Sequence, residues 1–126
     1  MAIPENLKYT KEHEWMLIEG ETATIGITNY AQGELGDVVF VDIDANLKEL
    51  VAGEKFGVIE AVKTVSELYA PCSGKVLEIN TELNGMPDRV NRDPYGAGWM
   101  IKVEITNPAE LDNLLDSTGY GALIGD

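Results

Sequence analysis

Lys63 is the residue whose position in the sequence points most clearly to chemistry, because it lies at the tip of an expected hairpin. Residues 58–62 and 65–69 both alternate with a period of two and are rich in β-branched side chains, which predicts two strands that meet near Lys63. A two-residue hairpin turn usually contains Asn-Gly, Asp-Gly or Gly-X, because the favoured turns need positive φ angles. Val62 and Lys63 offer none of these, and departures of this kind are expected chiefly at functional sites. The tip is therefore predicted to display the Lys63 amine; an ordinary solvated lysine is the alternative that spacing alone leaves open.

The remaining reactive side chains do not form a recognisable catalytic set. His13 is the single histidine of the sequence, and beside Trp15 it is interpreted as structural, because one imidazole without partners makes neither a metal site nor a triad. Cys72 is the single cysteine, which excludes an intramolecular disulfide, and without a nearby histidine its thiol is expected to be inert. The sequence also has no glycine-rich phosphate-binding loop. These observations predict a protein that is not itself an enzyme.

Two runs around the lysine closely resemble the lipoylation hairpin of the glycine cleavage system H protein family: EAVK at 60–63 and YAPCSGKV at 69–76. The usual form in that family is Glu-Ser-Val-Lys-Ala, so Ala61 and Thr64 depart slightly from it, whereas Lys63 and Glu60 keep their places. Four further motifs follow the family's order, YTKEHEW at 9–15, GITNYAQ at 26–32, LGDVVFV at 35–41 and DPYGAGWM at 93–100. The resemblance covers nearly the whole chain.

The resemblance implies a carrier subunit of the glycine cleavage system. Lipoate would be joined to the Lys63 amine by a lipoate-attaching enzyme. The arm would take an aminomethyl group from a pyridoxal-phosphate-dependent glycine decarboxylase (P protein) and deliver it to a tetrahydrofolate-dependent aminomethyltransferase (T protein). A flavin-dependent dihydrolipoamide dehydrogenase (L protein) would then reoxidise the arm. Of the cofactors in this reaction sequence, only the lipoyl group would be bound to this chain.

Four glutamates are candidates to assist the lysine. A carboxylate beside a lysine favours the charged amine, which cannot attack an activated lipoyl ester, so we expect Glu60 to be recognised by the attaching enzyme instead. A solvated strand glutamate is the alternative. In the resembling family the loaded arm folds back into a cleft near the His-Glu-Trp segment. Glu14, together with Glu12 and Glu67, is therefore expected to accept hydrogen bonds from the carried amine in that cleft.

Other functions fit the same scaffold less well. Biotinyl domains typically have Met-Lys-Met at the hairpin tip, and lipoyl domains of 2-oxo acid dehydrogenase complexes typically have Asp-Lys-Ala. This chain instead has Val62 and Thr64 beside the lysine. A lipoyl or octanoyl donor in lipoate assembly would use the same lysine, so the sequence leaves that role open. An unmodified β interaction module is the alternative from another class.

Length and charge restrict the partners. The 126 residues are expected to form one domain over 1–126, and a monomer is expected. Nine basic and 22 acidic residues give a net charge of −13, which argues against nucleic acid or an anionic membrane as a partner and favours a basic protein surface. The charge could equally serve solubility alone. The N-terminus lacks a signal or transit pattern and no apolar run approaches 18 residues, so a complete cytoplasmic protein is expected.

The elements that must position the lysine are mainly strands. They are predicted at 14–19, 22–27, 37–43, 75–80 and 99–105 in addition to the hairpin, with a mixed connection at 46–53 and a loop at 84–98. Thr28 or Asn29 is expected to cap a single helical turn that Gly33 ends, and Pro108 to open a helix through Leu115. The glycine-rich tail at 119–125 is expected to lack a helix. With the resemblance, this predicts a flattened barrel-sandwich hybrid of the lipoyl/biotinyl carrier type, with a C-terminal helix and short helical turns.

Overall fold

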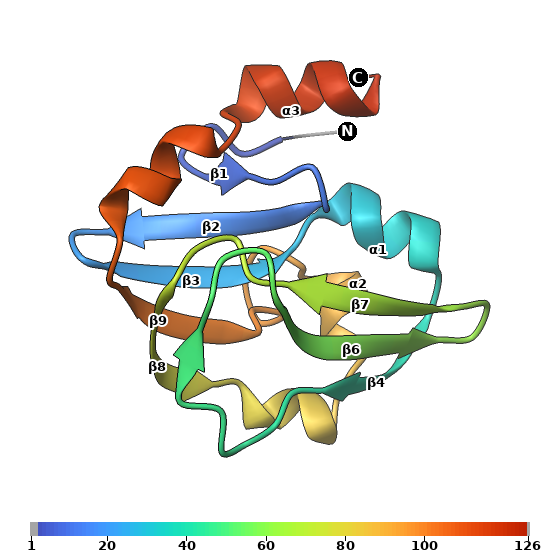
Figure 1. Cartoon of the computed structure of the whole chain (residues 1–126). Coiled ribbons are helices and arrows are strands. Elements are labelled where there is room, and N and C mark those ends of the chain that lie inside the picture. The colour runs from blue at the N-terminus through green and yellow to red at the C-terminus, as the bar shows by residue number, and fades with distance from the viewer. Residues whose placement is uncertain (1–2, 126) are drawn as a thin grey trace.

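Two antiparallel β-sheets form the body of the protein in a computed structural model that describes residues 3–125 (Figure 1). The larger sheet has the strand order β1-β2-β3-β9-β8-β5, and the smaller sheet has the order β4-β6-β7. In chain order the strands are β1 (Lys8–Tyr9), β2 (Glu14–Glu19), β3 (Thr22–Ile27), β4 (Val38–Asp42), β5 (Glu49–Leu50), β6 (Lys55–Ala61), β7 (Val65–Tyr69), β8 (Gly74–Ile79) and β9 (Ile101–Ile105). The architecture is thus mainly β, and β2 and β3 have the predicted boundaries.

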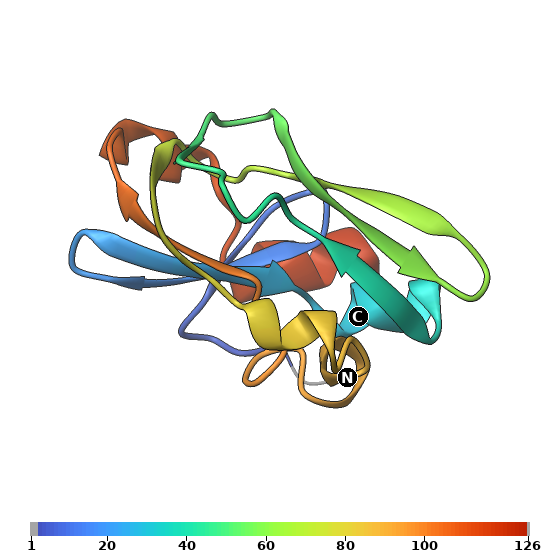
Figure 2. The same cartoon turned by 90° about the horizontal axis from the view of Figure 1, so that it is seen from below.

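The core lies between the two sheets, where alternate strand residues point inward. Ile25 and Ile101 of the larger sheet are fully buried in the same hydrophobic cluster as Ile59 and Leu68 of the smaller sheet. Figure 2, seen from below, shows the green strands of the smaller sheet on one side of the blue and orange strands of the larger sheet. Because every second residue of a strand faces the same way, this burial fixes which side chains of β6 and β7 remain outside.

The hairpin of β6 and β7 projects from the body, with Lys63 at its tip (Figures 1 and 2). The Ala61 N–H donates to the Thr64 carbonyl at 2.8 Å, and the Val62 N–H donates to the Asp37 carbonyl at 2.9 Å. Neither Val62 nor Lys63 has a positive φ, so the tip does not use the usual type I′ turn. The bond to Asp37 ties the tip to the start of β4 and holds it in place.

Helix α1 (Asn29–Leu35) is longer than predicted. Thr28 caps it, since its hydroxyl accepts a hydrogen bond from the Ala31 N–H at 3.1 Å. The expected stop at Gly33 is wrong. The helix continues because Ala31 and Leu35 both pack against the core, while Gly33 faces solvent. It ends instead at Gly36, whose φ of 81° suits a glycine.

The C-terminal part also differs from the prediction. The helix expected from Pro108 through Leu115 is a 3₁₀ helix, η2 (Pro108–Asn113), and the tail expected to lack a helix forms α3 (Ser117–Ile124). The Asp116 carboxylate accepts a hydrogen bond from the Gly119 N–H at 2.7 Å and so caps α3. Burial of Tyr120 against β1 and β2 outweighs the low helix propensity of the glycines.

The region predicted as a loop at 84–98 contains α2 (Arg89–Arg92), which follows η1 (Thr81–Asn84). The Asn91 side chain explains why this segment is ordered. Its amide donates to the carbonyl of Gly36 at 2.8 Å and to Gln32 at 3.0 Å, and its oxygen accepts from the Val38 N–H at 2.8 Å. Asn91 thereby joins α2 to the end of α1 and the start of β4. No helix within residues 3–125 is long and apolar enough to cross a membrane.

Candidate functional site

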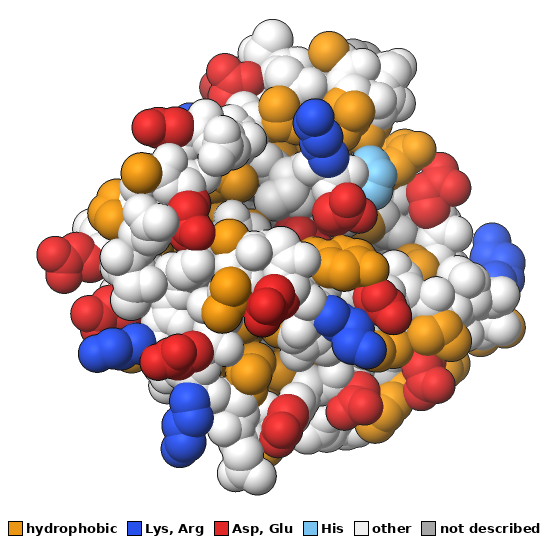
Figure 3. Space-filling view, in the orientation of Figure 1, with side chains coloured by type: hydrophobic (Ala, Val, Ile, Leu, Met, Phe, Trp, Pro, Cys, Tyr) orange, Lys and Arg blue, Asp and Glu red, His pale blue; other side chains and the backbone are white. Residues whose placement is uncertain are grey.

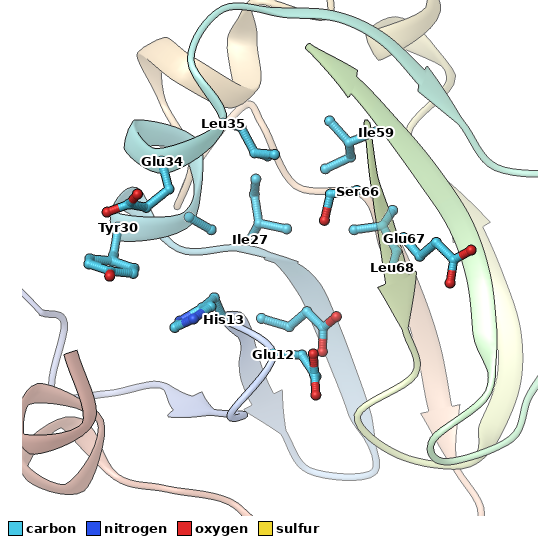
Figure 4. A pocket seen from close by; sticks show the side chains of 12 residues that line it. Glu12, His13, Ile27, Tyr30, Glu34, Leu35, Ile59, Ser66, Glu67 and Leu68 are labelled. Carbon is cyan, nitrogen blue, oxygen red and sulfur yellow. The ribbon is translucent and has the colours of Figure 1, made fainter. Parts of the chain in front are cut away.

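A cavity of about 240 Å³ lies between α1, the strand pair β2–β3 and the hairpin strands β6 and β7 (Figure 4). It is lined by Glu12, His13, Glu14, Ile27, Tyr30, Ala31, Glu34, Leu35, Ile59, Ser66, Glu67 and Leu68. Pockets for whole small ligands usually measure about 300–1,000 Å³. A cavity of this size suits the end of a flexible arm better than a whole cofactor.

The walls follow from the periodicity of the elements that build them. On α1, Tyr30 and Ala31 lie one turn before Glu34 and Leu35, so all four side chains share one face of the helix. On β7, Ser66 and Leu68 face inward on alternate positions (Figure 4). The cavity therefore has one helical wall and one strand wall, with an apolar floor.

Glu14 is the buried carboxylate of the cavity, with a relative exposure of only 2%. One oxygen accepts the Tyr69 N–H at 3.0 Å and the other accepts the Thr10 hydroxyl at 3.0 Å. Burial raises the pKa of Glu14 to about 7, although these two hydrogen bonds oppose the rise. Glu14 is therefore poised to exchange a proton near neutral pH, and it has capacity to accept a further hydrogen bond.

His13 lies at the wall of the same cavity in an unusual backbone conformation. Its φ is 68°, and it is the one non-glycine residue between positions 3 and 125 with a positive φ. Its Nδ1 lies 2.9 Å from the Tyr120 hydroxyl, and its ring is 5.0 Å from that of Tyr30. Burial lowers the pKa of His13 against the opposing effect of Glu12 and Glu34, so the ring is mainly uncharged at neutral pH. These contacts agree with the predicted structural role.

The structure brings the three predicted cleft glutamates to one cavity, but their carboxylates differ in position. Glu12 is exposed at the rim beside His13, and the space-filling view shows red side chains around the hollow near the pale-blue histidine (Figure 3). Glu67 points away from the centre of the cavity (Figure 4). Its carboxylate accepts the Tyr69 hydroxyl at 2.6 Å and lies 3.8 Å from the Lys55 amine. Glu14 is therefore the carboxylate best placed to contact a group inside.

Lys63 is exposed and leaves the hairpin beside the end of α1. Its Cε lies 2.9 Å from the point where a Cβ on Gly36 would stand. Gly36 directly follows Leu35, which lines the cavity. Figures 1 and 2 agree that the hairpin tip lies next to this end of α1. The lysine and the cavity are therefore neighbours at this end of α1.

Glu60 is separated from the cavity by the sheet itself. It is exposed on the outer face of β6, opposite Phe40 of β4 and Val65 of β7. Its inward neighbour Ile59 lines the cavity. Glu60 is therefore available to a protein that docks on the hairpin, but not to a group inside the cavity.

Sequence reasoning missed the contribution of α1 and of Ser66. Glu34 and Leu35 were beyond the helix expected to stop at Gly33, although the spacing of Ala31 and Leu35 is a signal for one helical face. Ser66 could have been inferred from the apolar Leu68, because strand residues two positions apart face the same side of a sheet. The helical spacing and the strand alternation identify cavity residues only when it is known against which elements α1 and β7 pack.

Cys72 is the other side chain whose reactivity the sequence raised. Cys72 is buried, and burial raises the pKa of its thiol to about 11, so the thiolate is scarce at neutral pH, in agreement with the expected inert thiol. Within residues 3–125, no group of three or more His, Cys, Asp or Glu side chains could hold a metal ion.

Comparison with known proteins agrees with this geometry. A family model described as Glycine cleavage H-protein matches residues 7–126. The chain is 57% identical over 120 residues to the glycine cleavage system H protein of Symbiobacterium thermophilum, covering 95% of this chain and 94% of that protein. It is 56% identical over 126 residues to that of Staphylococcus haemolyticus, covering 100% of both. The crystal structure of a glycine cleavage system H protein from Mycobacterium marinum matches with a TM-score of 0.86 and 37% identity, covering 98% of this chain and 100% of that one. This likeness confirms the predicted barrel-sandwich fold.

Proposed function

The chain belongs to the glycine cleavage H-protein family and is thus a lipoyl carrier of glycine cleavage, and we propose that it carries the aminomethyl group of glycine on an arm attached to Lys63. In this proposal the arm is loaded at a pyridoxal-phosphate-dependent glycine decarboxylase, unloaded at a tetrahydrofolate-dependent aminomethyltransferase and reoxidised by a dihydrolipoamide dehydrogenase. The chain itself catalyses none of these reactions.

The residues at the hairpin tip fit a covalently attached lipoyl group. Lys63 is exposed, and its backbone is held because the neighbouring Val62 N–H is bonded to Asp37. When attached, the lipoyl group supplies the dithiolane that accepts the aminomethyl group and is later reoxidised. Lys63 supplies the amide link, and the hydrogen bonds of the hairpin tip to Thr64 and Asp37 limit the directions from which the arm can start.

One observation carries the proposal: the exposed Lys63 stands beside the end of α1, next to a cavity that holds the buried carboxylate of Glu14. An aminomethyl group on sulfur is prone to hydrolysis, so a carrier must keep water from it between enzymes. The apolar floor of Ile27 and Leu68 excludes water, and ionised Glu14 can accept a hydrogen bond from the amine. Glu12 can assist at the rim, and Glu67 only if its side chain leaves Tyr69.

The core and the net charge of the chain bear on its domain organisation and its partners. We place it in the cytoplasm as one domain over residues 1–126 and as a monomer; Met1, Ala2 and Asp126 lie outside the described residues. The core shared by both sheets supports the single domain. The net charge of −13 supports partners with basic surfaces, to which an acidic carrier is attracted over a distance.

Reconstitution tests this function directly. The lipoylated chain is mixed with the decarboxylase, the aminomethyltransferase, the dehydrogenase, glycine, tetrahydrofolate and NAD⁺, and glycine-dependent formation of methylenetetrahydrofolate is followed. We expect turnover with the lipoylated chain. We expect none with the unlipoylated chain or with the Lys63→Arg variant. The exposed Lys48→Arg is the matched control and should behave as the parent. Turnover that did not depend on Lys63 would contradict the proposal.

A further inference from the structure

The outer face of the smaller sheet carries an exposed apolar patch around the lysine. Among residues 3–125, eight large hydrophobic side chains are strongly exposed, and four of them lie on β4, at the hairpin tip or on β7. These four are Val39, Phe40, Val62 and Val65, which we call the hairpin patch. Figure 3 shows orange side chains with red ones between them over this part of the molecule, at the lower right of the view. So many exposed apolar side chains in one place mark an interaction surface.

Glu60 lies within the hairpin patch. The strand register places Phe40 opposite Glu60 and Glu60 opposite Val65, so the carboxylate stands between two apolar side chains in one cross-strand row. Phe40 is 42% exposed and Val65 is 60% exposed. A partner that covers both side chains must also cover Glu60. Because a buried carboxylate is costly unless it is paired, such a partner must bring a lysine or arginine to this point.

The next row of the same face is acidic. Asp42 pairs with Val58, and Val58 pairs with Glu67, and both carboxylates are exposed. Asp37 is also exposed at the start of β4, where its carbonyl holds the hairpin tip. The surface that fits here is therefore apolar at its centre, has one cation aimed at Glu60 and is basic at its edge.

We propose that the hairpin patch is the docking surface for the enzyme that acylates Lys63, an inference that rests on the proposed lipoyl attachment. The attaching enzyme must bring the activated lipoyl carbonyl to Nζ itself, so its body must cover the residues next to the lysine. Enzymes that act on the dithiolane meet the far end of the arm and have no such need. Phe40 and Val65 then provide the contact area, and Glu60 provides the specificity.

Initial rates of lipoylation test this proposal. The concentration of the chain is varied at a fixed concentration of a purified lipoate-attaching enzyme with lipoate and ATP. The lipoylated product is quantified by intact-protein mass spectrometry. Phe40→Ser and Val65→Ser should each lower kcat/KM by about tenfold, mainly through KM, as expected when an interface side chain is removed. Glu60→Gln should lower it by a similar factor. Leu77→Ser is the matched control, because Leu77 is 51% exposed on β8, outside the patch, and it should stay within about twofold of the parent.

Two further measurements separate the possible failures. Thermal unfolding of each variant shows whether a slow rate reflects loss of fold, and reoxidation of the fully lipoylated, reduced variants by the dehydrogenase shows whether the patch serves this one partner. The loss in attachment should exceed the loss in reoxidation several-fold. Equal losses in both, or Phe40→Ser behaving like Leu77→Ser, would overturn the docking surface while leaving the carrier function intact. A folded parent that gains no lipoyl group at Lys63 would overturn the carrier function as well.

Discussion

The hydroxyl of Tyr120 on the C-terminal helix α3 lies 2.9 Å from Nδ1 of His13, 107 residues away in the sequence. The same hydroxyl lies 2.7 Å from Oγ1 of Thr28, the residue that caps α1. His13 and α1 both form walls of the cavity beside the lysine. One buried phenol therefore positions two walls that belong to different elements.

Tyr120→Phe should remove the hydrogen bonds at this junction without leaving a cavity in the core. The phenyl ring would keep the stack on Tyr9, whose centroid is 4.7 Å away, but Thr28 and His13 would each lose a buried partner. We expect the free energy of unfolding to fall by about 1–3 kcal/mol, measured by urea denaturation. Tyr69→Phe is the control, because its hydroxyl bonds Glu67 at the surface and its loss should cost less than about 1 kcal/mol. Equal losses in the two variants would contradict the role given to Tyr120.

Glu14 should make the stability of the protein fall as pH rises from about 4.5 to about 7. Its pKa is raised from 4.5 to about 7 in the fold, so in this interval the native chain holds a proton that the unfolded chain has lost. Ionisation then favours the unfolded chain, and the loss from this residue amounts to about 3 kcal/mol at most. Below pH 4.5 both states are protonated and the effect is absent.

Glu14→Gln should remove this decline, as seen in unfolding free energies measured at intervals across the same pH range. Glu49→Gln, at an exposed position on β5, should leave the decline in place. A decline of unchanged size in Glu14→Gln would show that burial of Glu14 does not control the pH dependence.

Glu14 should also protect the loaded arm. With the aminomethyl group in place, Glu14→Gln should release formaldehyde roughly fivefold faster or more than the parent at pH 8, because an ionised acceptor is replaced by a neutral one. The exposed Glu78→Gln on β8 provides the matched control and should release it at the parent rate. If Glu14→Gln and the parent lost formaldehyde at the same rate, Glu14 would have no part in the shelter.

Gly36 should affect the lysine side chain through space. Gly36→Ala places a methyl group 2.9 Å from Cε of Lys63, and the φ of 81° adds backbone strain. Gly53→Ala is a matched control with a φ of 84° but with no atom within 4 Å of the new Cβ. Both variants should lose roughly 1–3 kcal/mol of stability from the backbone. Only Gly36→Ala should shift the side-chain NMR signals of Lys63, and an unshifted spectrum would place the lysine elsewhere.

The sequence predicted those parts of the fold that depend on local alternation. The pattern at Glu14–Glu19 and Thr22–Ile27 gave both strands with their observed ends, since alternate burial leaves a direct signal. It did not predict α3, because that helix depends on the packing of Tyr120 against Tyr9 and Trp15 of β1 and β2. It also ended α1 too early, because the packing of Leu35 outweighs the low propensity of Gly33.

The candidate site divides in the same way. The hairpin tip and Glu14 could be located from motifs that are continuous in the sequence. The position of Glu60 between Phe40 and Val65 could not, because β4 and β7 reach β6 through a register that only the fold determines. The link from Tyr120 to His13 is of the same kind.

The most direct test of Lys63 as the carrier residue is a mass measurement of the parent chain after incubation with a lipoate-attaching enzyme, lipoate and ATP. We expect a gain of one lipoyl group in the intact protein, located on Lys63 by peptide mapping, and the same gain in Lys48→Arg. Lys63→Arg should gain none. A folded parent that gains nothing, or a Lys63→Arg variant that gains a lipoyl group as readily as the parent, would contradict the assignment of Lys63 as the carrier residue.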